Sequence, residues 1–180
     1  MAYLTYIIDH YHKQIPSIVA FLHSHHNGFW KAWHVDDPLH DNANALQHLQ
    51  LDYVRQQGYV NLRCNWAPGC TKFSSPNPHI SNQTWEEIFA NTSTPYFDFD
   101  PFRPAASSKA SSEHNDVFSS RIWTSCCAQF AVSREQIYRR PVQDYVNIRE
   151  WLLNTELDDA SSGRTLEYLW HVIFGKEAVQ

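Results

Sequence analysis

The stretch CCAQFAVSREQ, residues 126–136, decides how this chain is expected to fold. Its first seven residues are mostly apolar and predict a buried strand, the third of the chain. Ser133-Arg-Glu-Gln136 matches a capping box, in which two side chains satisfy the first amide groups of a helix. A strand that passes directly into a helix is typical of α/β domains.

The same alternation of strands and helices continues outward from this stretch. Further strands are predicted at residues 17–23 and 59–63. Helices are predicted at residues 3–13, 42–57, 84–89, 133–140, 142–154 and 163–174. This order predicts an α/β three-layer sandwich, with a small, mainly parallel sheet flanked by helices. Residues 91–120, rich in Ser, Thr, Pro and Asp, are expected to form a flexible excursion of one domain, 1–180.

The composition limits the class of protein. The chain has 180 residues, of which 43% are hydrophobic and 14% aromatic, as expected for one domain with one core. A net charge of −5 argues against binding of nucleic acid or anionic membranes, because both need a cationic face. No apolar run approaches the roughly 20 residues of a transmembrane helix, so no membrane span is expected. The oligomeric state is left open.

The first residues of the sequence do not resemble a secretion signal. They lack a basic region, and Asp9 and His10 interrupt their apolar stretch. As the chain stands, we expect a cytoplasmic protein. The glycosylation sequons at Asn82 and Asn91, with four cysteines, keep a secretory lumen open as the alternative if the natural N-terminus is longer.

A set of short motifs is spread along nearly the whole chain. They are FLH (21–23), AWH (32–34), GYVNLRC (58–64), PGC (68–70), CCAQFAVSR (126–134) and SGRxxEYxWHxxFGK (162–176). Together they resemble an uncharacterised ascomycete fungal family, one of the numbered domains of unknown function. That resemblance implies no activity. It also implies that a segment preceding the first helix, with a first strand, is missing here.

A fainter resemblance is to nucleotide-sugar glycosyltransferases. In those enzymes too, a strand runs into a Ser-Arg-Glu type of helix start after an acidic loop. The similarity concerns the fold, and it implies a transferase-like domain only by analogy.

The last predicted helix carries most of the candidate catalytic residues. Arg164, Glu167, Tyr168 and His171 are spaced so that they would share one face of that helix. The opposite face is predicted to be core, and consists of Leu166, Leu169, Trp170 and Ile173. A glutamate one turn from a histidine can orient the imidazole, and a nearby arginine can hold a phosphate or carboxylate. The alternative is a solvated polar stripe.

Histidines after the first strand form a second candidate cluster. His23 and His34 are predicted to be catalytic, because the carboxyl ends of parallel strands line the ligand crevice in open α/β sheets. The run from His23 to His26 could bind a transition metal, although loop histidines usually bind nothing. Candidate substrate-binding residues are Arg134, Gln129, Tyr168, Asp158 and Asp159. Asp158 and Asp159 could also hold a metal, or could simply favour a helix N-terminus electrostatically.

A divalent metal, Mn²⁺ or Mg²⁺, is the one cofactor for which the sequence offers a candidate site. Asp98-Phe-Asp100 matches the pattern with which many glycosyltransferases hold a metal and a nucleotide diphosphate. The alternative is an acidic turn. Cys126 and Cys127 are expected to point to opposite faces of their strand, one into the core and one into a cleft. A cysteine nucleophile beside His171 is a lesser alternative.

Several catalytic motifs are absent. The chain has no Gly-x-Gly-x-x-Gly, Walker, His-Glu-x-x-His or Gly-x-Ser-x-Gly sequence, which argues against the matching enzyme classes. The leading hypothesis is a glycosyltransferase-like domain that acts on a small-molecule substrate. One alternative is a non-catalytic remnant or interaction domain. Another is an acyl or aminoacyl transferase that uses a basic patch of Arg134, Arg139 and Arg140. Whether the chain is an enzyme is left open.

Overall fold

The computed structural model describes residues 1–63, 65, 79–89, 92, 122 and 124–176. Its strands form a small sheet in the order β1-β3-β2. The strands are β1 at Ile18–Phe21, β2 at Tyr59–Asn61 and β3 at Phe130–Ser133. Both outer strands run antiparallel to β3. The prediction of a mainly parallel sheet is therefore wrong.

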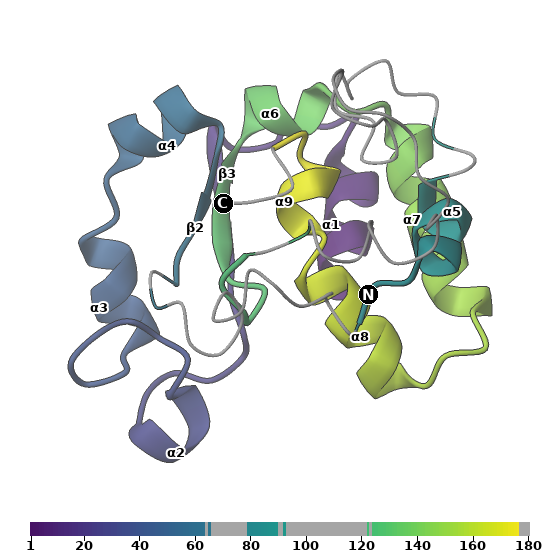
Figure 1. Ribbon diagram of the computed structural model, residues 1–180. Coiled ribbons are helices and arrows are strands. Elements are labelled where there is room, and N and C mark those ends of the chain that lie inside the picture. Colours follow the sequence, from purple (N-terminus) through teal and green to yellow (C-terminus); the bar gives the residue numbers. More distant parts are fainter. Residues whose placement is uncertain (64, 66–78, 90–91, 93–121, 123, 177–180) are drawn as a thin grey trace, which may run out of the picture.

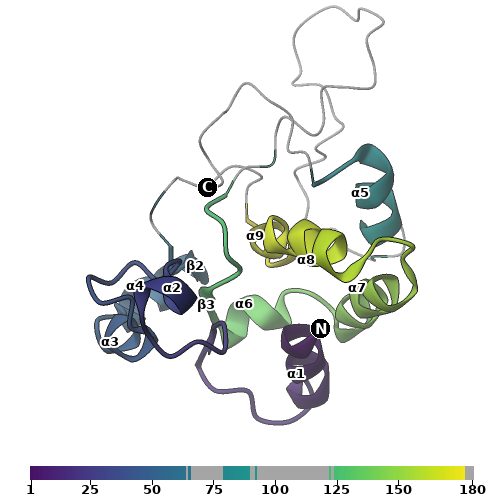
Figure 2. The ribbon, with the colours of Figure 1, turned by 90° about the horizontal axis from the view of Figure 1, so that it is seen from below.

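Helices surround this sheet. They are α1 (Ala2–His10), α2 (Phe29–Ala32), α3 (Asn42–Gln47), α4 (Leu51–Gln57), α5 (Asn82–Phe89), α6 (Arg134–Tyr138), α7 (Val142–Asn154), α8 (Asp159–Glu167) and α9 (Trp170–Ile173). Figures 1 and 2 show α2, α3 and α4 on one side of the sheet, and α1, α7, α8 and α9 on the other. The prediction of a sheet flanked by helices agrees with this arrangement. None of the helices described is long and apolar enough to cross a membrane.

The parallel sheet was predicted wrongly for a physical reason. The segment containing α2, α3 and α4 connects β1 to β2 and leaves these two strands parallel to each other, as helical connections do. They do not pair, because β3 lies between them and runs the opposite way. A long connection such as that from β2 to β3 can return the chain to the sheet in either direction, and the alternation of elements does not set that direction.

Local chemistry sets many of the helix ends. The Ser133 side chain accepts the amide proton of Gln136, so the helix start predicted there is confirmed. Gly58 ends α4 with φ of 76°, a conformation that glycine adopts without strain. The predicted helices over 42–57 and 163–174 are each interrupted, the first at residues 48–50 and the second at residues 168–169.

The pairing register places three chain segments at one edge of the sheet. Phe130, the first residue of β3, pairs with Phe21 at the end of β1 and with Asn61 at the end of β2. The residues that follow β1, those that follow β2 and those that precede β3 therefore meet at this edge. We call it the Phe130 edge.

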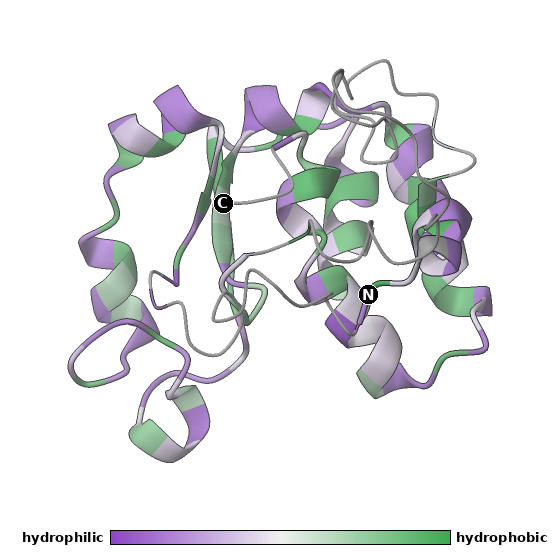
Figure 3. Ribbon diagram, viewed as in Figure 1, coloured by the Kyte–Doolittle hydropathy of each residue, from purple (hydrophilic) through white to green (hydrophobic). Residues whose placement is uncertain are grey.

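An aromatic core lies on one face of the sheet. Phe130 contacts Phe21, Tyr59 and Trp170, with ring centroids 5.1, 5.2 and 5.2 Å away. Phe174 joins this cluster at 5.4 Å from Phe130. Figure 3 shows α9 and much of α1 coloured as hydrophobic where they pack over the sheet. The predicted core face formed by Leu166, Leu169, Trp170 and Ile173 is confirmed, since all four are buried.

Candidate functional site at one edge of the sheet

Gln129 holds the Phe130 edge together. Its side-chain Oε1 accepts the backbone amide proton of His23 at 3.0 Å, and its carbonyl accepts that of Leu62 at 2.9 Å. The residue before β3 thus binds the segments that leave β1 and β2. Gln129 is buried. It was predicted to bind substrate, and here it positions His23.

Two histidines pack against each other at this edge. The rings of His23 and His34 lie 4.6 Å apart, and His25 lies 6.0 Å from His34. His34 is 5% exposed, and its Nε2 has no hydrogen-bond partner among the residues described. Burial, with the charges of His23, His25 and Arg63 adding to it, lowers the pKa of His34 to about 4. His34 is therefore neutral at pH 7.

Burial also lowers the pKa of His23, while the charge of Glu167 opposes that shift. Glu167 comes from the end of α8 and is largely buried. Its Oε1 accepts the amide proton of Cys127 at 2.6 Å, and its Oε2 lies 3.4 Å from Nη1 of Arg164. Arg164, Glu167 and His23, which belong to two separate predicted clusters, are thus linked electrostatically through Glu167.

Cys126 and Cys127 form a disulfide between adjacent residues in the turn that precedes β3. Both are buried. Cys127 has φ of 90° and Ala128 has φ of 43°, in the left-handed region that residues with a side chain seldom adopt. No strand can pass through such residues, so the predicted strand over 126–132 begins only at Phe130. The two cysteine side chains therefore do not point to opposite faces of the sheet, as was predicted.

The cysteines and Glu167 also form a potential metal-binding group. One ligand atom from each of these three residues lies within 4.8 Å of the others. A thiolate is the form of cysteine that binds metals, and the disulfide removes both thiolates. This group could therefore hold a soft cation only after reduction of the disulfide.

A cavity of about 550 Å³ opens beside His23. Its walls include the apolar side chains of Tyr3, Leu166 and Trp170. Polar groups come from His23 and, at the start of α8, from Asp159 and Ser162. An apolar pocket of this size with a few convergent polar groups is typical of small-molecule sites.

His171 lies apart from this cavity because the last helix is broken. Tyr168 and Leu169 separate α8 from α9, so the face predicted to run unbroken from Arg164 to His171 does not form. His171 is 0% exposed and packs in the core. Tyr168 stacks on His79, with ring centroids 5.7 Å apart. The single helix predicted over 163–174 is wrong.

Other predicted residues have structural contacts. Asp158 caps α8 by accepting the amide proton of Ser161 at 2.7 Å, and this bond lowers the pKa of its carboxyl. Arg134 lies at the opposite end of β3 from Gln129, and donates to the carbonyl of Ile15 at 3.3 Å. Arg134 therefore does not lie near the Phe130 edge, and its predicted role in binding substrate there has no support from its position.

The predicted basic patch does not form. Arg140 is 3% exposed, and its Nη1 lies 3.0 Å from the buried carboxylate of Asp144. Arg134, Arg139 and Arg140 thus share no exposed surface. Asp98 and Asp100, the predicted metal ligands, lie outside the described residues, as does most of the predicted excursion 91–120.

The comparisons with known proteins identify a family. A family model described as "Protein of unknown function (DUF3431)" matches residues 1–180. The chain belongs to this family. No curated protein and no solved structure matches the chain. The predicted membership of an uncharacterised family is thus confirmed, while fungal origin and similarity to glycosyltransferases stay predictions.

In this DUF3431 member, a buried arginine at the Phe130 edge was missed from the sequence. Arg63 follows β2, and its guanidinium lies 5.2 Å from the Trp33 ring and 3.7 Å from Asp36. Asn65 also donates to Asp36 at 2.9 Å. The sequence signal was the position of Arg63 as the last residue of the strand predicted at 59–63, like that of His23 in the strand predicted at 17–23.

Proposed function

We propose that the Phe130 edge is the substrate site of a transferase-like enzyme, in which His23 acts as the general base. The observation that carries this proposal is the position of His23. Its side chain lines the 550 Å³ cavity and is electrostatically coupled to the carboxylate of Glu167. A base beside a carboxylate at the wall of a cavity is a common catalytic arrangement.

The lowered pKa of His23 suits this role. An imidazole that is neutral at pH 7 can accept a proton from a substrate hydroxyl. The negative charge of Glu167 then stabilises the imidazolium that forms. The deprotonated oxygen attacks the carbon of the transferred group, and the leaving group departs with its bonding electron pair. Asp159 and Ser162 can accept hydrogen bonds from other hydroxyls of the substrate.

The glycosyltransferase-like version of this proposal adds an activated sugar as donor. A cavity of about 550 Å³ is large enough for a sugar ring, which has both apolar faces and hydroxyl edges. The divalent metal predicted at Asp98 and Asp100 belongs to this version. In this version Arg164, whose side chain is 56% exposed and pairs with Glu167, contacts the diphosphate.

The test is a thermal-shift and calorimetric screen of nucleotide sugars with Mn²⁺. We expect one donor to raise the melting temperature and to be turned over. His23→Gln should abolish turnover, while His26→Gln, an exposed histidine of the same loop, should not. Equal turnover in both variants, or no donor that binds, would contradict the proposal.

An interaction domain is the second candidate, and one observation favours it. Phe29 and Trp30 of α2 are exposed, Trp30 by 90%, and Leu39 nearby is exposed too. Clustered exposed apolar side chains often mark interaction surfaces. If they mediate self-association, light scattering should show a mass that rises with concentration, and Trp30→Ser should remove that rise. A constant monomer mass would exclude self-association through this surface.

A further inference from the structure

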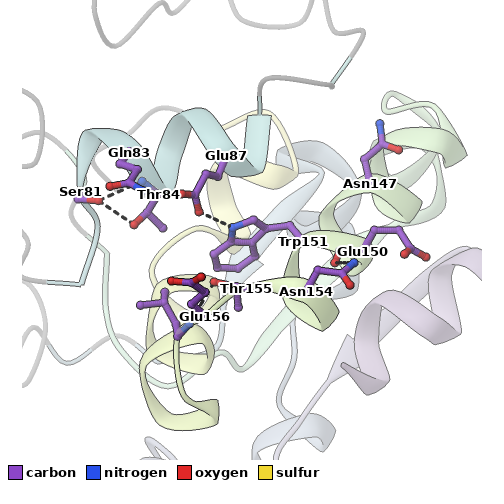
Figure 4. Close-up of a pocket in the computed structure, with 11 residues that line it drawn as sticks. Ser81, Gln83, Thr84, Glu87, Asn147, Glu150, Trp151, Asn154, Thr155 and Glu156 are labelled. Carbon is purple, nitrogen blue, oxygen red and sulfur yellow. Dashed lines mark hydrogen bonds between the residues drawn. The ribbon is translucent and has the colours of Figure 1, made fainter.

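A second hollow, of about 850 Å³, lies between α5 and α7 and shares no lining residue with the cavity at His23. Figure 4 shows the side chains that line it. They are Ser81, Gln83, Thr84, Glu87, Asn147, Glu150, Trp151, Asn154, Thr155, Glu156 and Leu157. We call this hollow the α5–α7 groove.

One aromatic ring lies at the centre of the groove. Trp151 is half-buried, and Figure 4 shows it between the two helices. Its indole Nε1 donates to Oε2 of Glu87 at 3.1 Å. The other oxygen of Glu87 accepts from Nε2 of Gln83 at 2.8 Å. The indole is therefore fixed at its polar edge by α5, which orders the ring before any ligand binds.

Polar side chains surround this ring on both helices. On α7, Asn147, Glu150 and Asn154 fall on the same helical face as Trp151, at spacings of three and four residues. α5 contributes amide, hydroxyl and carboxylate groups across from them. The groove therefore offers one flat apolar surface bordered by hydrogen-bond acceptors and donors.

The charge of the groove excludes one group of ligands. Glu87, Glu150 and Glu156 line it, and none of the described residues that line it is a lysine, arginine or histidine. Phosphates, nucleotides and acidic peptides would be repelled by these carboxylates. A neutral ligand rich in hydroxyl groups would not be, because its hydroxyls can donate to the carboxylates.

We propose that the α5–α7 groove binds a neutral carbohydrate. A sugar ring carries C–H groups on its faces and hydroxyls around its rim, which match an indole face bordered by polar groups. One ring unit stacks on Trp151, and its hydroxyls bond to Glu150, Asn154 and Glu156. An organic cation is the rival ligand. It is favoured less, since cation sites usually enclose the charge with several aromatic rings, and Trp151 is the one aromatic ring among the described residues that line this groove.

The site lies outside the cavity at His23, so the inference does not depend on the proposed function. It would hold even if the Phe130 edge catalyses nothing. A carbohydrate bound at the groove could be the acceptor of a transfer reaction or simply a tethering ligand, and the binding experiment does not require either role.

The experiment measures binding of cellohexaose, chitohexaose, maltohexaose and mannohexaose to the full chain by titration calorimetry and saturation-transfer NMR. We expect at least one hexaose to bind, with transfer concentrated on its ring C–H protons. Trp151→Ala should weaken that binding about ten-fold or more. Tyr53→Ala, which removes an exposed aromatic ring on α4 outside the groove, should leave the affinity unchanged.

A second pair of variants guards against unfolding, because Trp151 also packs against the core. Asn154 and Glu156 are exposed, so Asn154→Ala with Glu156→Gln should weaken binding several-fold at an unchanged melting temperature. Leu153→Ala, an exposed change on α7 outside the groove, is the control. The inference is overturned if no hexaose binds, or if binding survives both Trp151→Ala and the double change. It is also overturned if tetramethylammonium binds at these residues and the hexaoses do not.

Discussion

The Phe130 edge and the α5–α7 groove are two polar sites built in opposite ways. The first joins segments far apart in the sequence, such as His23, Gln129 and Glu167, and encloses them next to the aromatic core. The second comes mainly from facing sides of two neighbouring helices, with a half-buried tryptophan ring between them. At the first site burial lowers the pKa of both His23 and His34. We therefore propose proton transfer for the first site and recognition for the second.

The largest expected difference between the two regions is in stability. Trp170 lines the cavity at His23 and also packs on Phe130, and it is 4% exposed. Trp170→Ala should lower the free energy of unfolding by about 3–5 kcal/mol, measured by urea titration. Trp151→Ala should lower it less, because that ring is half-buried. A loss at Trp170 below about 1 kcal/mol would mean that the cavity wall is not part of the core.

The next difference is a dependence of stability on pH. The pKa of His34 falls from its ordinary value of 6.5 to about 4 in the folded chain. Its contribution is therefore fully present above pH 6.5 and is lost as the pH falls towards 4, since the unfolded chain binds the proton first. We expect a loss of up to roughly 3 kcal/mol over that range.

The control for this effect is His34→Gln, compared with wild type in urea titrations at several pH values. The variant should have a shallower loss of stability below pH 6.5, because a glutamine does not take up the proton. His48→Gln, an exposed histidine, should behave as wild type does. Parallel curves for His34→Gln and wild type would show that His34 is not buried in its neutral form.

The smallest effect concerns the charge of Glu167. Glu167→Gln keeps an oxygen that can accept the amide proton of Cys127 but removes the charge that raises the pKa of His23. The pKa of His23, followed by NMR of its ring protons, should therefore fall further. Glu156→Gln removes a carboxylate from the α5–α7 groove and should not move it. If the pKa of His23 does not change in Glu167→Gln, the charge of Glu167 does not act on His23, and the proposed role of His23 as a base loses its electrostatic support.

The sequence predicts local features of this fold well. The start of α6 at Ser133 and the end of α4 at Gly58 depend on residues within a few positions, and both could be predicted. The core face around Trp170 follows from helical spacing. These residues are buried as predicted even though the helix is interrupted at Tyr168. The interruption changes the direction of each side chain too little to take these residues out of the core.

What failed depends on contacts between distant segments. The direction of β3 is set by its pairing with Ile18–Phe21 and Tyr59–Asn61, which no local pattern encodes. The turn at Cys126 and Cys127 depends on a distant residue, Glu167, whose side chain accepts the backbone amide proton of Cys127. The α5–α7 groove was missed for a different reason. The helical spacing of Asn147, Glu150, Trp151 and Asn154 could be seen in the sequence, and a helix was predicted at 84–89, but the packing of that helix against α7 could not be predicted.

The position of β3 between β1 and β2 has a consequence for the order of folding. In the part of the chain that the structure describes, β1 and β2 each pair with β3 alone, and β3 is the last of the three in the sequence, so these pairings cannot form until Phe130–Ser133 has been synthesised. Until then β1 and β2 lack this partner, and unpaired strand edges are prone to bind other chains. Chaperone contacts would be expected at this stage. A messenger RNA that stops translation before Phe130 would yield a chain unable to build any of this sheet.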